Sequence, residues 1–180
     1  MPIPDHDNGD GFRDEERITR FSDDRVYRYT LWRDWFDDLF DHGAYAAPKP
    51  RFVMFIGLNP STADETKDDP TIRKCIGFAK RWGYSALCMT NLFAFRATDP
   101  RKMMGYSKPV GPDNDRWLAA TAREADRIIA AWGTKGEFMG RAEEVLKLLH
   151  NVECLRKTGQ GFPEHPLYVP YETRPIEYGN

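Results

Sequence analysis

The fold class is decided by residues 52–64, which read FVMFIGLNPSTAD. The first five are all apolar, and so short an apolar run is typical of a central parallel strand buried on both faces. Turn-forming and polar residues follow at once. Asp69 and Pro70 then supply an N-cap and a first helical residue, which predicts a helix that runs to Arg81 and stops at Gly83.

Strands and helices alternate along most of the chain. Further strands are predicted at 26–32, 85–91, 127–132 and 152–155, further helices at 112–124 and 136–150, and a long loop at 92–111. Because parallel strands need crossover connections, this alternation places helices on the faces of one sheet. We therefore expect an α/β fold, a three-layer α/β/α sandwich with a central, mostly parallel sheet.

The 180 residues fit one domain. Residues 1–20 are polar and lack periodicity, which predicts a flexible N-terminal arm before a single α/β domain at 21–180. No apolar run approaches the roughly 20 residues of a membrane span, so we expect a cytoplasmic protein without a membrane partner. The isolated positions of the three cysteines favour buried free thiols over metal ligands: Cys75, Cys88 and Cys154. We expect neither a metal nor another cofactor.

Charge is distributed unevenly, because residues 1–70 are acidic and residues 71–160 are basic. A basic segment favours an anionic partner such as DNA or a nucleotide, unless its charges are solvated helix faces that cancel in space. Five cations are expected to give the ligand-binding side of the protein, its cleft, a positive potential: Lys80, Arg81, Arg96, Arg101 and Lys102.

In open α/β sheets, ligands bind beyond the carboxyl ends of the strands. The loop at 57–64 leaves the first buried strand at such an end. Asn59 in this loop can hold a water molecule or a substrate edge, or it can form a turn with Ser61 that satisfies only the loop backbone. Ser61 and Thr62 are candidate substrate contacts, and Asp64 is a candidate helper of Asn59.

Polar and aromatic residues also follow the later strands. Asn91 ends the next strand, where its planar amide suits a planar ligand such as a base. Phe93 is either a stacking partner for that base or part of the core, and Arg96 is a candidate phosphate contact. Trp132, at the end of the third strand, is either a neighbour of the ligand or a core residue. His165 is the histidine that lies in one of the loops at this edge of the sheet.

Three strings resemble a bacterial and phage family of proteins of unknown function. They are GLNPSTAD at 57–64, DDPT at 68–71 and NLFAFRATDP at 91–100, and the resemblance covers about residues 25–170. The family itself implies no activity.

More distantly, the layout resembles the uracil-DNA glycosylase superfamily. The loop at 57–60, with Asn59, is similar to the glycosylase loop that positions the attacking water. Asn91 matches the residue that reads the base, the strand at 128–133 ends in Trp-Gly as in that superfamily, and His165 matches the histidine that stabilises the leaving base. Residues 167–170 depart from the superfamily's continuation, so no intercalating wedge is evident, and no stacking aromatic follows the first loop directly.

The resemblance implies an enzyme that removes a base from DNA or a nucleotide by water attack on the N-glycosidic bond. Asn59, helped by Asp64, would hold the water, Asn91 would read the base and His165 would stabilise the departing base. The alternative is a non-catalytic module that binds nucleic acid or a modified base in the same place. Formation of abasic sites, as opposed to a mobility shift alone, distinguishes the two.

Overall fold

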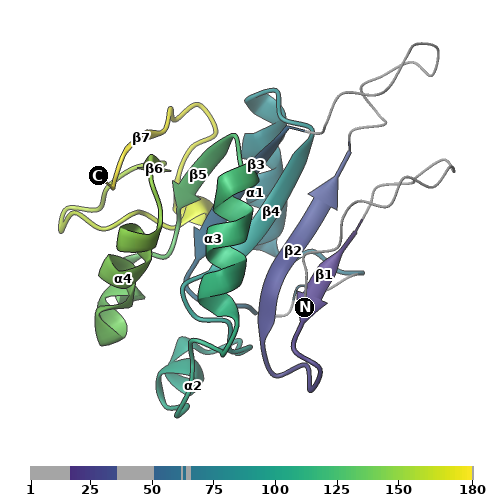
Figure 1. Cartoon of the computed structure of the whole chain (residues 1–180). Coiled ribbons are helices and arrows are strands. Elements are labelled where there is room, and N and C mark those ends of the chain that lie inside the picture. The colour runs from purple at the N-terminus through teal and green to yellow at the C-terminus, as the bar shows by residue number, and fades with distance from the viewer. Residues whose placement is uncertain (1–16, 36–50, 62, 64–65, 180) are drawn as a thin grey trace, which may run out of the picture.

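A computed structural model of the chain describes residues 17–35, 51–61, 63 and 66–179 (Figure 1). The described strands form one seven-stranded sheet in the order β1-β2-β4-β3-β5-β6-β7. They are β1 (Thr19–Phe21), β2 (Arg28–Asp34), β3 (Phe52–Gly57), β4 (Ala86–Asn91), β5 (Arg127–Ala130), β6 (Val152–Cys154) and β7 (Ile176–Glu177).

The four central strands are parallel. β3 pairs with β4 on one side and β5 on the other, and β5 pairs with β6. Each of the outer strands β1, β2 and β7 pairs in antiparallel fashion with the strand next to it toward the centre, which makes the sheet mixed. The prediction that residues 52–56, 86–91 and 127–132 form neighbouring parallel strands is therefore confirmed, although β5 ends at Ala130, and so is the α/β class.

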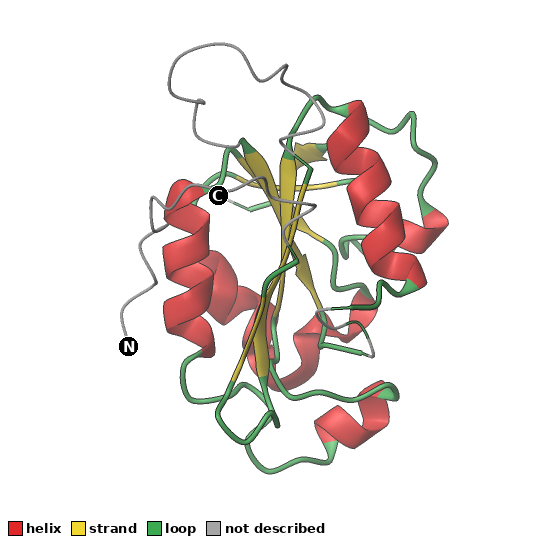
Figure 2. Ribbon diagram, turned by 90° about the vertical axis from the view of Figure 1, so that its right-hand side faces the viewer, coloured by secondary structure: helices red, strands yellow, loops and turns green. Residues whose placement is uncertain are grey.

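Helices cover both faces of the sheet (Figure 2). Successive residues of a strand point to opposite faces, so Phe55 lies in the core under α1 (Pro70–Arg81). Ile56 lies in the core on the other face, together with residues of α3 (Asn114–Glu124) and α4 (Arg141–Leu148). Apolar residues thus bury both sides of β3, as its uniformly apolar sequence predicts.

Two helices begin with the same Asp-Pro pair. The Asp69 side chain accepts a hydrogen bond from the backbone N–H of Ile72, which caps α1 where the sequence predicts it. The Asp99 side chain accepts from the backbone N–H of Arg101 in the same way and caps α2 (Pro100–Met104). The prediction of one unbroken loop over 92–111 is wrong, although the second Asp-Pro pair was a readable signal.

The predicted helix over 136–150 is interrupted. A 3-10 helix, η2 (Thr134–Gly140), comes first, and α4 starts only at Arg141. Met139 and Gly140 have φ angles of 59° and 67°, in the left-handed region that cannot continue a right-handed helix. The interruption therefore splits the predicted helix at these two residues.

The N-terminal arm lies mostly outside the described residues, which begin at Arg17. Thr19 and Arg20, which the sequence places in the arm, pair with Leu31 and Thr30 of β2. The paired part of the domain therefore begins before residue 21.

The carboxyl edge of the sheet, where β3, β4, β5 and β6 end, is the edge at which the sequence places the site. α1 begins there after β3 and runs back to the amino edge, because a crossover helix runs antiparallel to the strands it joins. Lys80 and Arg81 occupy its last turn, where Lys80 lies over the ring of Trp35. The prediction that these two cations make the cleft positive is wrong, because they lie at the opposite edge.

The connections from β3 and β5 leave the carboxyl edge toward different faces. β3 continues into α1, whereas β5 continues into η2 and α4 on the other face. Adjacent parallel strands whose connections diverge in this way form a switch point, the usual position of a ligand in an open α/β sheet. The loops after β3 and β5 therefore flank the place where a ligand is expected.

Candidate functional site

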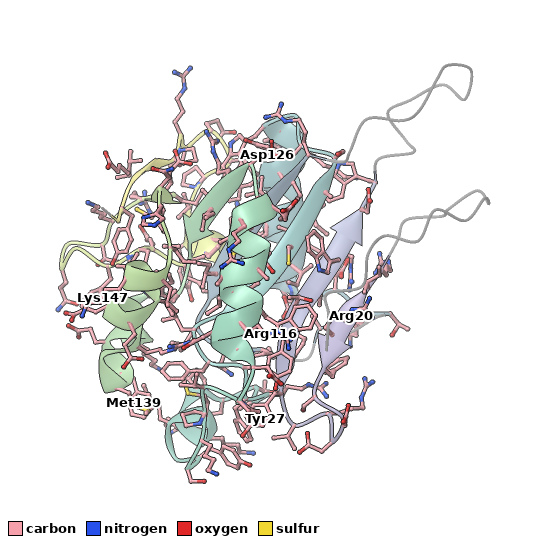
Figure 3. All side chains as sticks on the ribbon, in the orientation of Figure 1. Arg20, Tyr27, Arg116, Asp126, Met139 and Lys147 are labelled. Atoms are coloured by element: carbon pink, nitrogen blue, oxygen red, sulfur yellow. The ribbon has the colours of Figure 1, made fainter. Side chains whose placement is uncertain are left out.

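The carboxyl edge is the end of the sheet near α2. Figure 3 labels Tyr27 at this end and Asp126, which precedes β5, at the opposite end. Tyr27 forms a β-bridge with Phe95, just beyond the end of β4. The loops after β3 and β4 meet beside this bridge, since the N–H of Ala97 donates to the carbonyl of Pro60 over 2.9 Å.

Asn59 is half-buried in the loop after β3. Its Nδ2 donates to the carbonyl oxygens of Ala97 at 2.8 Å and Pro60 at 3.1 Å. Because both neighbours are acceptors, the amide orientation is determined, and Oδ1 has no hydrogen-bond partner among the described residues. Asn59 therefore ties two loops together and still offers an acceptor oxygen to a water molecule.

Asn91 ends β4 opposite Gly57 and is 3% exposed. A Cβ atom on Gly57 would lie 2.8 Å from Oδ1 of Asn91, so the glycine makes room for the amide. Leu87 and Met89 lie in the core under α1, and the two-residue period of a strand places Asn91 on that same face. Its Nδ2 is buried and has no hydrogen-bond partner, which is costly unless a ligand supplies an acceptor.

His165 lies at the same edge and on the same face. The N–H of Gly133 donates to the carbonyl of Pro163 over 3.0 Å, which fastens this loop just beyond β5. His165 then precedes the 3-10 helix η3 (Pro166–Tyr168), which packs against α1. Burial lowers the pKa of His165, and the nearby Asp69 carboxylate partly opposes this shift.

The tautomer of His165 follows from its neighbour. The backbone N–H of Leu167 donates to Nδ1 of His165 over 3.4 Å, so Nδ1 is the acceptor of the neutral ring. The ring proton then resides on Nε2, and the lowered pKa keeps the imidazole neutral at pH 7. His165 is therefore a neutral hydrogen-bond donor through Nε2.

Two arginines of β2 hold the loop after β3, and both are 2% exposed. Arg28 donates through Nη1 to the carbonyl of Ala63 over 2.6 Å, and Arg33 donates through Nε to Asp68 over 2.7 Å. Sequence reasoning missed both residues, because a charged residue in a strand near the edge of a sheet is normally expected to be exposed. Their burial follows from the loop that covers them, which no local pattern indicates.

Arg28 differs from Arg33 in its charge balance. Burial lowers the pKa of Arg28 to about 10, and Asp69 partly opposes the shift, so the guanidinium remains cationic at neutral pH. Whereas Asp68 pairs with Arg33, no carboxylate among the described residues forms an ion pair with Arg28. The Nε atom of Arg28 is also buried without a hydrogen-bond partner.

Two residues on the other face hold the end of β4. Asn114, at the start of α3, donates through Nδ2 to the carbonyls of Asn91 at 3.0 Å and Leu92 at 2.9 Å. Arg141, at the start of α4, also donates to Leu92 and pairs with Asp115 and with Glu144. Asn114 and Arg141 were missed too, because only the tertiary packing brings these helix starts against β4.

An open groove adjoins Asn59 where the two loops meet. Its volume is about 530 Å³, and it is lined by Arg25, Val26, Ser61, Phe95, Arg96, Ala97 and Thr98. Two predicted site residues, Ser61 and Arg96, therefore lie together in it. Another hollow, of about 470 Å³, lies by the end of α4 and Tyr178 and contains none of the predicted site residues.

The structure does not bring all candidates to a surface. Phe93 is fully buried and packs on Phe138, and Trp132 is 2% exposed and packs on Tyr178. Both occupy the core on the α3 and α4 side, so neither offers a ring face to a ligand in this structure. Thr62 and Asp64 lie outside the described residues.

The three cysteines are buried free thiols, as their spacing predicts. Burial raises the pKa of Cys154 to about 11 and raises that of Cys75 as well, so both remain protonated at neutral pH. No group of three or more histidine, cysteine, aspartate or glutamate residues that could hold a metal occurs in the described part of the chain. No helix among those same residues is long and apolar enough to cross a membrane.

Comparison with known proteins identifies the family. No curated protein and no solved structure matches the chain. A family model described as "Protein of unknown function (DUF1643)" matches residues 28–167. The match begins in β2 and ends in η3, so it spans the candidates from Asn59 to His165 and most of the chain. The chain belongs to the DUF1643 family.

Proposed function

We propose that this protein hydrolyses an N-glycosidic bond and thereby releases a base from DNA or a nucleotide. One observation carries the proposal. The amide of Asn91 is buried against Gly57 at the carboxyl edge, and its Nδ2 lacks an acceptor. An amide with an unsatisfied donor at a strand end suits the edge of a planar base, which presents acceptors and donors side by side.

In this reaction the oxygen of water bonds to the anomeric carbon as the carbon–nitrogen bond breaks. The bonding electron pair goes to the base, and the proton that water loses ends on the released base or in solvent. The sugar develops positive charge in the transition state. Oδ1 of Asn59 accepts a hydrogen bond from the attacking water, and the bond from Nδ2 to Ala97 keeps that oxygen oriented.

The leaving base carries negative charge, which a hydrogen-bond donor stabilises. His165 supplies such a donor through Nε2, because Leu167 occupies Nδ1 and the lowered pKa keeps the ring neutral. An asparagine amide cannot accept a proton as a general base, so this design is expected to be slower than one with a carboxylate at position 59. Beside His165, the residues Leu167 and Tyr168 are 42% and 71% exposed, so this loop has an apolar surface that a nucleic acid can contact.

A panel of oligonucleotides, each with one modified or mismatched base, tests the proposal. We expect one member to yield abasic sites that alkali then cleaves, and the free base to appear in equal amount. His165→Ala should abolish most of this signal. His150→Ala is the matched control, because His150 is exposed near the other hollow and should leave the signal unchanged.

The absence of cleavage across the panel, together with a clear mobility shift, would replace this proposal by the non-catalytic binding module. The same buried amide favours that second candidate function, since an unpaired donor recognises a base whether or not water then attacks. Binding that Asn91→Ala weakens, without any base release, is the result that identifies the module.

A further inference from the structure

We propose that the groove between the loops after β3 and β4 binds the phosphate backbone of a nucleic-acid strand. This inference rests on the proposed function and places the strand next to the base site. The groove is lined by Arg25, Ser61, Phe95, Arg96 and Thr98, among other residues. Among the described residues, its lining contains two cations and two hydroxyl groups and no carboxylate, a combination that suits a phosphodiester.

The two groove arginines are held close together. The guanidinium carbon of Arg25 lies 4.0 Å from the centroid of the Phe21 ring, and that of Arg96 lies 4.7 Å from the same centroid. Nη1 of Arg96 also donates to the carbonyl of Arg25 over 3.2 Å. Because both guanidinium groups lie over one ring, an anion bound between them would contact two cations at once.

A third cation, Arg28, lies beneath the loop after β3, which forms one side of the groove. Arg28 is bonded to Ala63 in the loop that also carries Ser61, and its charge interacts with that of Arg96. Arg28 is buried, and it forms no ion pair with a carboxylate of the described residues. Burial of a cation without an ion pair is costly, and a bound anion would reduce that cost. The Nε atom of Arg96 is buried without a partner as well.

Aromatic rings favour a nucleic-acid strand over a free inorganic anion. Phe95 lines the groove and stacks on Tyr106, with ring centroids 3.9 Å apart, and Tyr106 is 38% exposed. Proteins that bind single strands combine such rings, on which bases stack, with cations that follow the backbone. The groove therefore has both parts of a strand-binding surface beside Asn59.

Fluorescence anisotropy with a labelled single-stranded oligodeoxynucleotide tests the inference in the full-length protein. Arg96→Gln should weaken binding about tenfold and reduce the slope of log affinity against log salt by about 0.7, the value for one lost phosphate contact on a single strand. Arg101→Gln is the matched control, because Arg101 is exposed on α2 and pairs with Asp99 outside the groove. It should change the affinity less than twofold.

Two competitors distinguish the source of the phosphate. We expect an unlabelled strand to displace the probe far more strongly than a 5′-mononucleotide or inorganic phosphate. If the mononucleotide competes as well as the strand, the strand assignment is wrong and the groove holds a free nucleotide. Equal weakening by Arg96→Gln and Arg101→Gln, or no binding of any probe, overturns the phosphate site itself.

The inference and the proposed function can fail separately. If the wild-type protein binds strands through Arg96 but releases no base, the hydrolase proposal fails and the groove remains. If base release occurs and Arg96→Gln leaves both binding and release unchanged, the groove assignment fails and the hydrolase remains. His165→Ala should retain strand binding, because His165 does not line the groove.

Discussion

Arg28 and Arg141 are equally buried at the carboxyl edge of the sheet, each 2% exposed, but on different sides of it. Arg141 donates to the carbonyl of Leu92 and pairs with two carboxylates, those of Asp115 and Glu144. Arg28 donates to a backbone carbonyl and has no carboxylate partner among the described residues. Both residues are arginines and are equally buried, but only the charge of Arg141 is neutralised by carboxylates of the described residues.

This difference separates a structural residue from a candidate ligand contact. A buried charge with its partners in place is accounted for by the fold, whereas one that the described residues leave without an ion pair is a candidate for contact with a ligand. Unpaired atoms also occur on the α3 and α4 side, at Oδ1 of Asn114 and Nε1 of Trp132. Both groups are neutral, so their burial costs less than that of a guanidinium.

The largest expected effect on stability comes from replacing each arginine by methionine. Arg141→Met should lower the free energy of unfolding by about 2–3 kcal/mol, because it removes a charged donor from the buried Leu92 carbonyl and two ion pairs with half-exposed carboxylates. Arg28→Met should change it by less than about 1 kcal/mol, since relief of the unpaired charge offsets the lost hydrogen bond. Urea denaturation of both variants measures the two values, and equal losses would remove the distinction.

The two buried asparagines of β4 and α3 sharpen the same comparison. Asn114→Ala should cost about 2 kcal/mol, because the carbonyls of Asn91 and Leu92 lose their shared donor. Asn91→Ala should cost about 1 kcal/mol or less, because its Nδ2 makes no hydrogen bond that could be lost. The same denaturation experiment measures both, and a larger cost for Asn91→Ala would mean that its amide is a structural group.

The sequence predicts the central strands and α1 because their signals are local. The apolar run at 52–56 and the cap at Asp69 each depend on neighbouring residues, and the rule for strand ends then places Asn59 and Asn91 at one edge. It misses Arg28 and Arg141, because burial of a charge depends on which distant segments cover it.

The errors of the charge prediction have a related cause. Lys80 and Arg81 follow the candidate loop closely in sequence, but the length and direction of α1 carry them to the other edge. Arg25, which lines the groove, lies in the acidic first part of the chain and was not considered. Phe93 and Trp132 follow strand ends as ligand contacts would, but Phe138 of η2 packs on the first and Tyr178, which follows β7, packs on the second. Charged and aromatic residues could therefore be assigned to the groove, to another surface or to the core only from the tertiary structure.

A smaller effect is expected from pH. The pKa of His165 is lowered in the folded protein, so below about pH 6.5 the unfolded state binds more protons than the folded state. The contribution of this residue is therefore present above the unfolded pKa and is lost as pH falls through the folded pKa. Unfolding free energies between pH 5 and 8 should lose part of their slope in His165→Gln.

Asp69→Asn gives a second reading of the same titration. Asparagine caps a helix about as well as aspartate, so α1 should remain intact, but the charge that opposes the shift is removed. The pKa of His165, followed by NMR, should then fall further. A rise in that pKa, or an unchanged pH slope in His165→Gln, would show that burial does not control this histidine.

The most direct test of the account is the turnover of three proteins on the first substrate that the oligonucleotide panel identifies. His165→Ala and Asn59→Ala should each lower kcat by roughly a hundredfold to a thousandfold, equivalent to about 2.7–4 kcal/mol, because their partners carry charge or form bonds fully only in the transition state. Asn91→Ala should mainly raise KM and relax the choice of base. Unchanged turnover in both His165→Ala and Asn59→Ala, with the substrate still cleaved, would contradict the assignment of the chemistry to this edge of the sheet.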